Sequence, residues 1–144
     1  MEINEEMLNS IILSIRPIYN DLIVKKEKLY EFRNFKPKTF SNYFWVYESS
    51  PNKHLKYLMR ITEPVVFPDK LIGISYGVDR FNTGEMDSKY AYKIIEVYQL
   101  EKPLSMEYLQ KNFNFTPPQA YTYLQRNSKL QNYIAKNVKL RKII

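Results

Sequence analysis

Apolar and polar residues alternate along several short stretches of the chain, with the period of two that is typical of β-strands with one buried face. The stretch 43–47 consists only of aromatic and β-branched residues, which favour extended backbone. A short apolar run near the N-terminus, residues 11–15, also has the length of a buried strand. Strands are therefore predicted over residues 11–15, 28–33, 43–47, 55–62 and 90–100.

Other segments show helical signals. Pro17 follows the first predicted strand at a position suited to the first turn of a helix, and apolar residues then recur at helical intervals up to Ile23. A short helix is expected from Met106. Thr116 and Ser128 each stand three residues before a glutamine, which is capping-box spacing, so two further helices are predicted to close the chain. The last one has an apolar stripe at every fourth residue, formed by Leu130, Ile134 and Val138.

Backbone freedom is concentrated in one segment, because all three glycines lie between Leu71 and Asp87. The spacing of these glycines matches no phosphate-binding fingerprint. This segment is therefore predicted to be a long, mobile loop, and no chemistry is assigned to its glycines.

Length and composition limit the classes of function. A chain of 144 residues has the usual size of one domain, and its longest apolar runs are far shorter than the roughly 18 residues that span a bilayer. There is no cysteine and only one histidine, His54, so neither a disulfide nor a zinc centre is expected, and no cofactor is predicted. The composition does not rule out a magnesium ion bound by carboxylates. The acidic N-terminal residues Met1 to Met7 lack the pattern of a secretory signal, so a cytoplasmic location without membrane contact is expected.

Positive charge is segregated at the C-terminal end. The formal net charge is +7, and the part of the chain up to Glu107 holds 15 basic and 15 acidic residues. All seven excess positive charges follow Glu107, at Lys111, Arg126, Lys129, Lys136, Lys139, Arg141 and Lys142. Such asymmetry is typical of a surface that binds a polyanion, although a lysine-rich terminal helix also serves solubility. On the first interpretation the nucleic-acid backbone contacts are Lys129, Lys136, Lys139, Arg141 and Lys142.

Four segments carry a family resemblance through their order and spacing: Ser14–Pro17, Lys26–Arg33, Tyr47–Pro51 and Pro117–Gln119. Together they resemble the ASCH family of PUA-like domains over most of residues 11–126. The resemblance implies an α+β fold, a small PUA-like β-barrel of five or six mostly antiparallel strands with helices at its ends. Residues 1–10 are then expected to be an N-terminal extension, and residues 127–144 a C-terminal basic helix packed on the domain or extending from it.

The most specific part of the resemblance is the pattern of Lys28, Glu31 and Arg33, which is expected to line a cleft. Glu31 and Arg33 are two residues apart in a predicted strand, so their side chains leave the same face about 7 Å apart. Arg33 can donate a forked pair of hydrogen bonds to a phosphate, and Glu31 can accept from an exocyclic amine. The alternative is a same-face ion pair that recognises nothing. Lys26 stands where the family usually has glycine, so the preceding turn is expected to differ.

Other residues are candidates for the same cleft. Lys28 is a candidate for a depressed pKa and for proton transfer, or else a solvated charge at the strand end. Arg16, before the predicted helix, is a candidate phosphate contact, with a simple surface role as the alternative. Tyr47, beside Ser49, is chosen over Trp45 as a ring that stacks on an unpaired base, although aromatic residues in a short strand are usually core. The ligand-binding set is thus Arg16, Lys28, Glu31, Arg33, Tyr47 and Ser49, while His54 is expected at the surface.

The resemblance implies that the ligand is RNA or a nucleotide, bound in a regulatory role or in RNA metabolism. Some family members resemble amidohydrolases that act on acylated cytidine, and others are linked to RNA cleavage, so an amidohydrolase or a ribonuclease is the alternative. As an amidohydrolase, the chain would use Lys28 as the base, assisted by Glu31. The hydrolase branch has threonine where this chain has Glu31, and Asp79 is only a conceivable counterpart of its distal acid. A third possibility, a protein-binding module with a tyrosine-rich surface, is supported by composition alone. The sequence does not indicate the oligomeric state.

Overall fold

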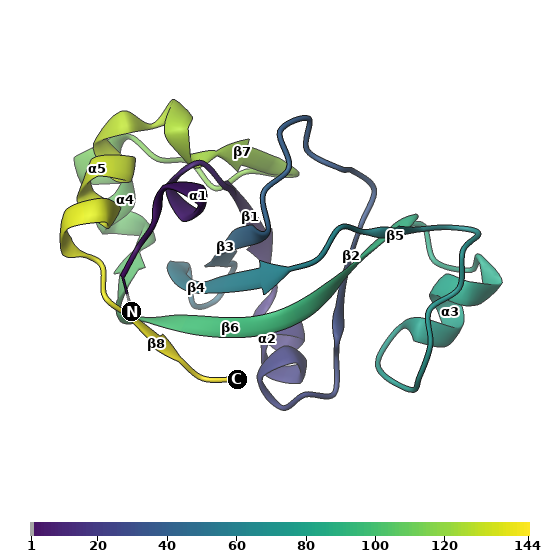
Figure 1. Cartoon of the computed structure of the whole chain (residues 1–144). Coiled ribbons are helices and arrows are strands. Elements are labelled where there is room, and N and C mark those ends of the chain that lie inside the picture. The colour runs from purple at the N-terminus through teal and green to yellow at the C-terminus, as the bar shows by residue number, and fades with distance from the viewer. Residues whose placement is uncertain (1) are drawn as a thin grey trace.

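The predicted alternation of apolar and polar residues produces a mixed β-sheet that curls into a half-barrel, with short helices around it (Figure 1). The structure is a computed structural model that describes residues 2–144. Its strands are β1 Ile11–Ile15, β2 Tyr30–Arg33, β3 Tyr43–Glu48, β4 His54–Ile61, β5 Val65–Val66, β6 Tyr90–Ser105, β7 Tyr121–Tyr123 and β8 Leu140–Lys142. Its helices are α1 Glu5–Leu8, α2 Pro17–Val24, α3 Val78–Thr83, α4 Met106–Phe113 and α5 Ser128–Asn137, with a 3-10 turn η1 at Leu124–Arg126.

The strand order is β2-β6-β4-β3-β1-β7, and β5 and β8 also pair with β6. Within residues 2–144, only β1 and β3 run parallel, and the other pairs are antiparallel. The α+β PUA-like barrel that the sequence predicted is confirmed, although the described residues form a sheet of eight strands where five or six were expected. Each of the four segments 28–33, 43–47, 55–62 and 90–100 contains a strand.

Strand β6 is the longest and organises the sheet, because it pairs with four other strands. It runs five residues beyond the predicted end at Leu100. Its pairing with β4 is irregular between Leu55 and Tyr57, whose partners on β6 are Leu104 and Gln99. Pro103 lies within this irregularity, where a residue without an N–H group is tolerated.

Both faces of the central strands are covered. On β3, Tyr43, Trp45 and Tyr47 point into a core that the C-terminal helices share, whereas Phe44 and Val46 point into a second core inside the curled sheet. All six residues of β3 are buried as a result. The N-terminal residues join the first core, because Met7 of α1 is buried and its carbonyl accepts a hydrogen bond from Trp45 Nε1 at 2.7 Å.

The C-terminal part differs from the sequence expectation in two places. The helix predicted from Thr116 does not form, and residues 121–123 instead pair with β1 as β7. The last helix covers only Ser128–Asn137 and is followed by β8 on the edge of β6, so the basic helix over 127–144 is shorter than predicted. Asn127 rather than Ser128 caps it, since its side-chain oxygen accepts from the backbone N–H of Leu130 at 3.2 Å. In both places the backbone pairs with a strand edge, which satisfies more polar groups than one capping box does.

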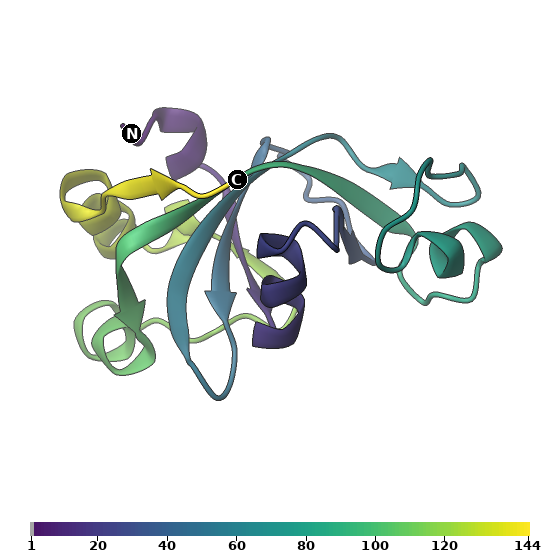
Figure 2. The ribbon, with the colours of Figure 1, turned by 90° about the horizontal axis from the view of Figure 1, so that it is seen from below.

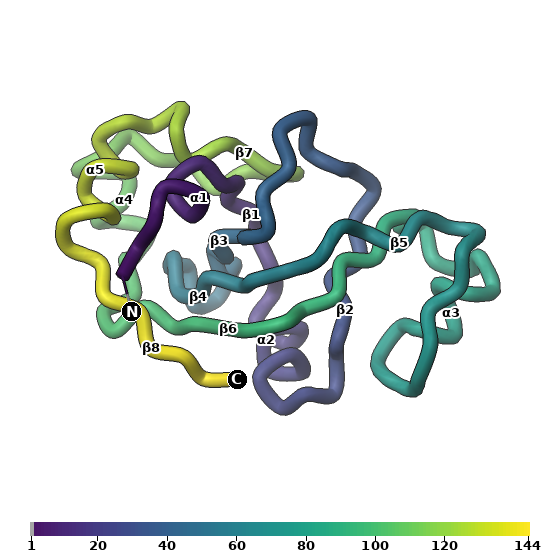
Figure 3. The backbone as a smooth tube through the Cα atoms, viewed as in Figure 1, coloured from purple at the N-terminus to yellow at the C-terminus, as the bar shows by residue number. Residues whose placement is uncertain are grey.

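The glycine-bearing segment contains a helix rather than only a loop. Figure 3 follows the chain from β5 through α3 and back into β6 in a lobe at one end of the molecule. Gly77 and Gly84 bound α3 with φ values of 84° and 80°, which glycine adopts without strain. Val78 and Phe81 of α3 pack with Leu71, Tyr30 and Ala91 in a third small core. Within residues 2–144, no helix is long and apolar enough to cross a membrane.

Candidate functional site

A cleft of about 330 Å³ lies where α2, β2 and the lobe containing α3 approach one another. In Figure 2, α2 lies between the curled sheet and this lobe. The cleft is lined by Ser14, Ile15, Arg16, Tyr19, Lys28, Glu31, Phe32, Arg33, Tyr76, Arg80 and Met86. Its volume is at the lower end of the range for small-ligand pockets, roughly 300–1,000 Å³. Four of the six predicted ligand-binding residues therefore line one cavity.

An ion-pair network forms one side of the cleft. Lys28 Nζ lies 2.6 Å from Glu31 Oε1, and Arg33 Nε lies 2.7 Å from Glu31 Oε2, so each carboxylate oxygen has its own cation. Lys28 also donates to the carbonyl of Tyr30 at 2.6 Å. Lys28 and Glu31 are only 4% and 5% exposed, so this pair is not the solvated same-face pair that the sequence left open.

The protonation state of Glu31 follows from these contacts. Burial acts to raise the pKa of the Glu31 carboxyl, because it disfavours the charged form. The charges of Lys28 and Arg33, together with their hydrogen bonds, outweigh burial and hold this pKa below its usual value. Glu31 is therefore a carboxylate at neutral pH, and in this arrangement Lys28 acts as a hydrogen-bond donor.

Arg33 is partly committed to the protein itself. Its Nη2 donates to the backbone carbonyl of Ser14 at 2.8 Å, and the Ser14 hydroxyl donates to the carbonyl of Pro118 at 3.0 Å. The guanidinium thus links β2 to β1 as well as to Glu31. A forked contact between Arg33 and a phosphate would have to compete with these bonds, so Arg33 is better placed to hold the network together than to grip a ligand.

The opposite side of the cleft comes from segments far apart in sequence. Arg16 and Tyr19 belong to the start of α2, whereas Tyr76 and Arg80 belong to the lobe. The rings of Tyr19 and Tyr76 lie 5.8 Å apart. Within residues 2–144, neither Arg16 nor Arg80 makes an ion pair with an acidic side chain. Both arginines are exposed, and in the part of the chain that the structure describes their side chains make no hydrogen bond to the protein, so their N–H donors are available to a ligand.

Two predicted residues lie outside the cleft. Tyr47 is buried in the core, where its ring lies 5.9 Å from that of Phe115, and burial raises the pKa of its hydroxyl. Ser49 does not line the cavity, and its backbone N–H donates to the carbonyl of Ile15 at 3.0 Å. The tyrosines that line the cavity are instead Tyr19 and Tyr76, which no local sequence pattern singled out. Asp79 also lies outside the cavity lining.

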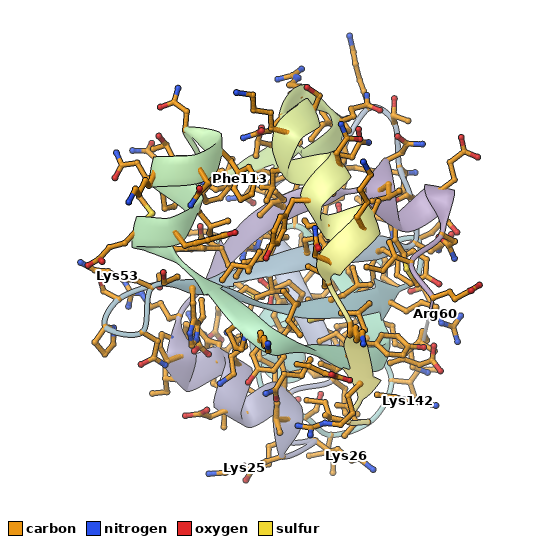
Figure 4. All side chains as sticks on the ribbon, turned by 90° about the vertical axis from the view of Figure 1, so that its left-hand side faces the viewer. Lys25, Lys26, Lys53, Arg60, Phe113 and Lys142 are labelled. Atoms are coloured by element: carbon orange, nitrogen blue, oxygen red, sulfur yellow. The ribbon has the colours of Figure 1, made fainter. Side chains whose placement is uncertain are left out.

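Among the basic C-terminal residues, Lys129 and Lys136 lie on α5, Arg141 and Lys142 lie on β8, and Lys139 lies between these two elements. Lys129, Lys136, Lys139 and Arg141 are exposed, while Lys142 is paired with Glu96 at 3.0 Å. Glu96 also accepts from Arg60 Nε at 2.7 Å, and in Figure 4 Lys142 and Arg60 lie on the same side of the molecule. The hydrogen bond from Arg60, with those from Tyr98 and Lys142, lowers the pKa of Glu96 to about 2. Part of the positive charge is therefore neutralised within the protein.

A second buried carboxylate was missed by the sequence reasoning. Glu48 is fully buried and accepts from Asn52 Nδ2 at 2.7 Å, His54 Nε2 at 2.9 Å and Asn20 Nδ2 at 3.0 Å. Burial acts to raise the pKa of Glu48, but the three hydrogen bonds and the more distant Lys56 charge lower it overall. His54 is thus half-buried in this network rather than a free surface residue. No sequence spacing joins Asn20 to Glu48, so no local signal pointed to this group.

Comparison with known proteins bears on the fold. No protein-family model and no curated protein sequence matches the chain. A crystal structure of ASCH from Zymomonas mobilis is similar, with a TM-score of 0.66 and 18% identity over 92% of this chain and 97% of that one. Crystal structures of two single-residue mutants of the same protein give TM-scores of 0.66 and 0.67 at 17% identity, each over 91% of this chain. The chain has the fold of an ASCH domain. This confirms the resemblance seen in the sequence.

At 17–18% identity the likeness to these structures concerns the course of the backbone and does not fix the chemistry of the cleft. Among residues 2–144, no group of three histidine or acidic side chains is arranged to hold a metal ion.

Proposed function

We propose that this ASCH-fold protein binds a nucleotide, either free or as one unit of an RNA strand, in the cleft between α2, β2 and the α3 lobe. One observation carries the proposal. The cavity lining holds four basic side chains and one carboxylate, an excess of three positive charges, beside two tyrosine rings. A nucleotide combines a phosphate with a planar base, and these are the groups that arginine donors and aromatic rings recognise.

The two sides of the cleft take different roles in this proposal. Arg16 and Arg80 face no carboxylate within residues 2–144, so both are assigned to the phosphate. Tyr19 and Tyr76 are assigned to the base, because their rings already lie 5.8 Å apart in the cavity. Glu31 keeps its role as an acceptor for an exocyclic amine, oriented by Lys28 and Arg33. The basic residues from Lys129 to Lys142 remain candidate contacts for a longer RNA.

The same geometry favours binding over amide hydrolysis. A general base needs a free lone pair within reach of the proton that it abstracts. Lys28 Nζ instead donates to Glu31 and to the carbonyl of Tyr30, both at 2.6 Å. We therefore propose a binding domain. Amidohydrolase activity is the alternative, and an assay for deacetylation tests it.

Titration calorimetry with the four ribonucleoside 5′-monophosphates tests the proposal. Wild type is expected to bind at least one of them, and Arg16→Gln and Arg80→Gln are each expected to weaken that binding about tenfold or more. This corresponds to the loss of one charge-assisted hydrogen bond, about 1.5–3 kcal/mol. Arg126→Gln, at an exposed arginine outside the cavity, is the matched control and should bind like wild type.

Two results would contradict the proposal. Absence of binding by wild type at millimolar nucleotide would remove it, and so would equal affinities for wild type and both cleft variants. Incubation of the protein with N4-acetylcytidine tests for amidohydrolase activity. Deacetylation that disappears in Lys28→Ala would replace the binding domain by an amidohydrolase.

A further inference from the structure

A short loop beside the cleft carries apolar side chains in an unusual position. Ile72 and Ile74 are 91% and 102% exposed, with Gly73 between them at φ 94°. Single exposed apolar residues are common on protein surfaces, but two fully exposed isoleucines one residue apart form a concentrated apolar contact. Within residues 2–144, no other side chain covers Ile72 or Ile74.

The loop is anchored at both ends. The backbone N–H of Leu71 donates to Asn82 Oδ1 at 2.7 Å, and Asn82 Nδ2 donates back to the carbonyl of Leu71 at 3.0 Å. At the other end, the N–H of Tyr76 donates to the carbonyl of Glu27 at 2.9 Å. Leu71 itself is buried in the core of the lobe. The loop that carries the two isoleucines is therefore held by hydrogen bonds at both of its ends.

The isoleucine loop continues directly into the cleft. Tyr76, at its end, lines the cavity and faces Tyr19 of α2. Ile18, the residue before Tyr19, is also 62% exposed. The exposed Ile74 thus stands two residues before a tyrosine that lines the cavity, and the same cavity lining holds Arg16 and Arg80.

We infer that Ile72 and Ile74 contact the unpaired base next to the nucleotide in the cleft, so that the ligand of this site is a single-stranded oligonucleotide. The inference rests on the proposed function of the cleft. Isoleucine is among the side chains that insert between neighbouring bases, and the bases of a single strand are free to be splayed apart. The charge of the cleft supports this occupant, because the strand carries a phosphate beside every base.

The same charge argues against a second copy of the chain on this surface. A two-fold symmetric contact through the isoleucine loop would place the same patch of each copy against the other. It would thereby bring two clefts, each with an unpaired Arg16 and Arg80, side by side. Juxtaposed like charges suppress such a contact, whereas they attract a polyanion.

The test compares one ligand unit with four. Binding of cytidine 5′-monophosphate and of the tetranucleotide of cytidine, whose base carries the exocyclic amine assigned to Glu31, is measured at one salt concentration for wild type and for the double variant Ile72→Ser, Ile74→Ser. Wild type is expected to bind the tetranucleotide at least tenfold more tightly than the monophosphate. The double variant should bind the monophosphate like wild type but the tetranucleotide five- to tenfold more weakly. Ile95→Ser, at an exposed isoleucine of β6 outside the cleft, is the matched control and should resemble wild type with both ligands.

Each other outcome has a defined meaning. Unchanged tetranucleotide binding by the double variant overturns the inference and leaves the cleft proposal standing. An equal loss for both ligands also overturns it, because the loop would then support the cleft in general. Failure of wild type to bind the tetranucleotide and all four ribonucleoside 5′-monophosphates contradicts the proposed function itself. Sedimentation that shows a wild-type dimer lost in the double variant assigns the loop to a second copy and overturns the inference.

Discussion

The buried network of Lys28, Glu31 and Arg33 makes a quantitative prediction about stability. Glu31→Gln keeps the shape of the side chain but leaves Lys28, which is 4% exposed, as a buried cation without its counter-charge. Removing one partner of a buried ion pair typically costs about 3–5 kcal/mol. Arg33 also loses its carboxylate, although it keeps its bond to the carbonyl of Ser14. We expect Glu31→Gln to lower the free energy of unfolding by about 3 kcal/mol or more, measured by urea unfolding.

The other members of the network should respond unequally. Lys28→Met should cost less than Glu31→Gln, because Glu31 retains Arg33 at 2.7 Å. The double variant Lys28→Met, Glu31→Gln should be more stable than Glu31→Gln alone, since it contains no unpaired buried ammonium group. This order of stabilities is the signature of coupling between the two charges, which a double-mutant cycle measures.

An exposed ion pair of the same protein supplies the control. Lys36 Nζ lies 2.5 Å from Glu63 Oε2, and both side chains are largely accessible to solvent. Exposed pairs contribute below about 1 kcal/mol, so Glu63→Gln should change the free energy of unfolding by less than that. If Glu31→Gln costs no more than Glu63→Gln, the network is not a buried counter-charge system, and the reasoning is refuted.

Three further outcomes are expected. Glu31 and Glu48 both have a pKa below the ordinary 4.5, so the stability that their ionised forms contribute is complete above that pH and is lost as the pH falls through the lowered pKa values. The urea concentration at the unfolding midpoint should therefore decrease when the pH is lowered below about 4.5, and it should decrease less steeply in Glu48→Gln. Gly77→Ala would place a Cβ 2.6 Å from Phe32 Cε2 at φ 84°, whereas the space around Gly73 is open, so Gly77→Ala should lower the melting temperature more than Gly73→Ala does. Replacing four basic residues by glutamine should shrink the log–log salt slope of RNA binding by about 3 units if all four contact phosphates of a single strand, and an unchanged slope would assign them to solubility. The four residues are Lys136, Lys139, Arg141 and Lys142.

The sequence by itself determined several strands, among them β2, which carries the ion-pair network of the cleft. The alternation in residues 28–33 and the aromatic stretch 43–47 were sufficient to predict strands, because successive side chains of a strand point to opposite faces of the sheet. Spacing alone also indicated that Glu31 and Arg33 share a face, and the structure places their charged groups 2.7 Å apart. Such features depend on neighbours in sequence, so they are visible before the chain is folded.

Only the tertiary structure decided which distant segments complete the cleft and the buried groups. Thr116 has capping-box spacing worth about 1 kcal/mol, yet nearby residues pair with β1, whose backbone groups need partners. Tyr19 meets Tyr76 across 57 positions of sequence, and Asn20 meets Glu48 because α2 packs over the end of β3. Burial and charge act between residues that are close in space, and the sequence order does not record those distances. The composition of the site therefore becomes visible only once the sheet has curled.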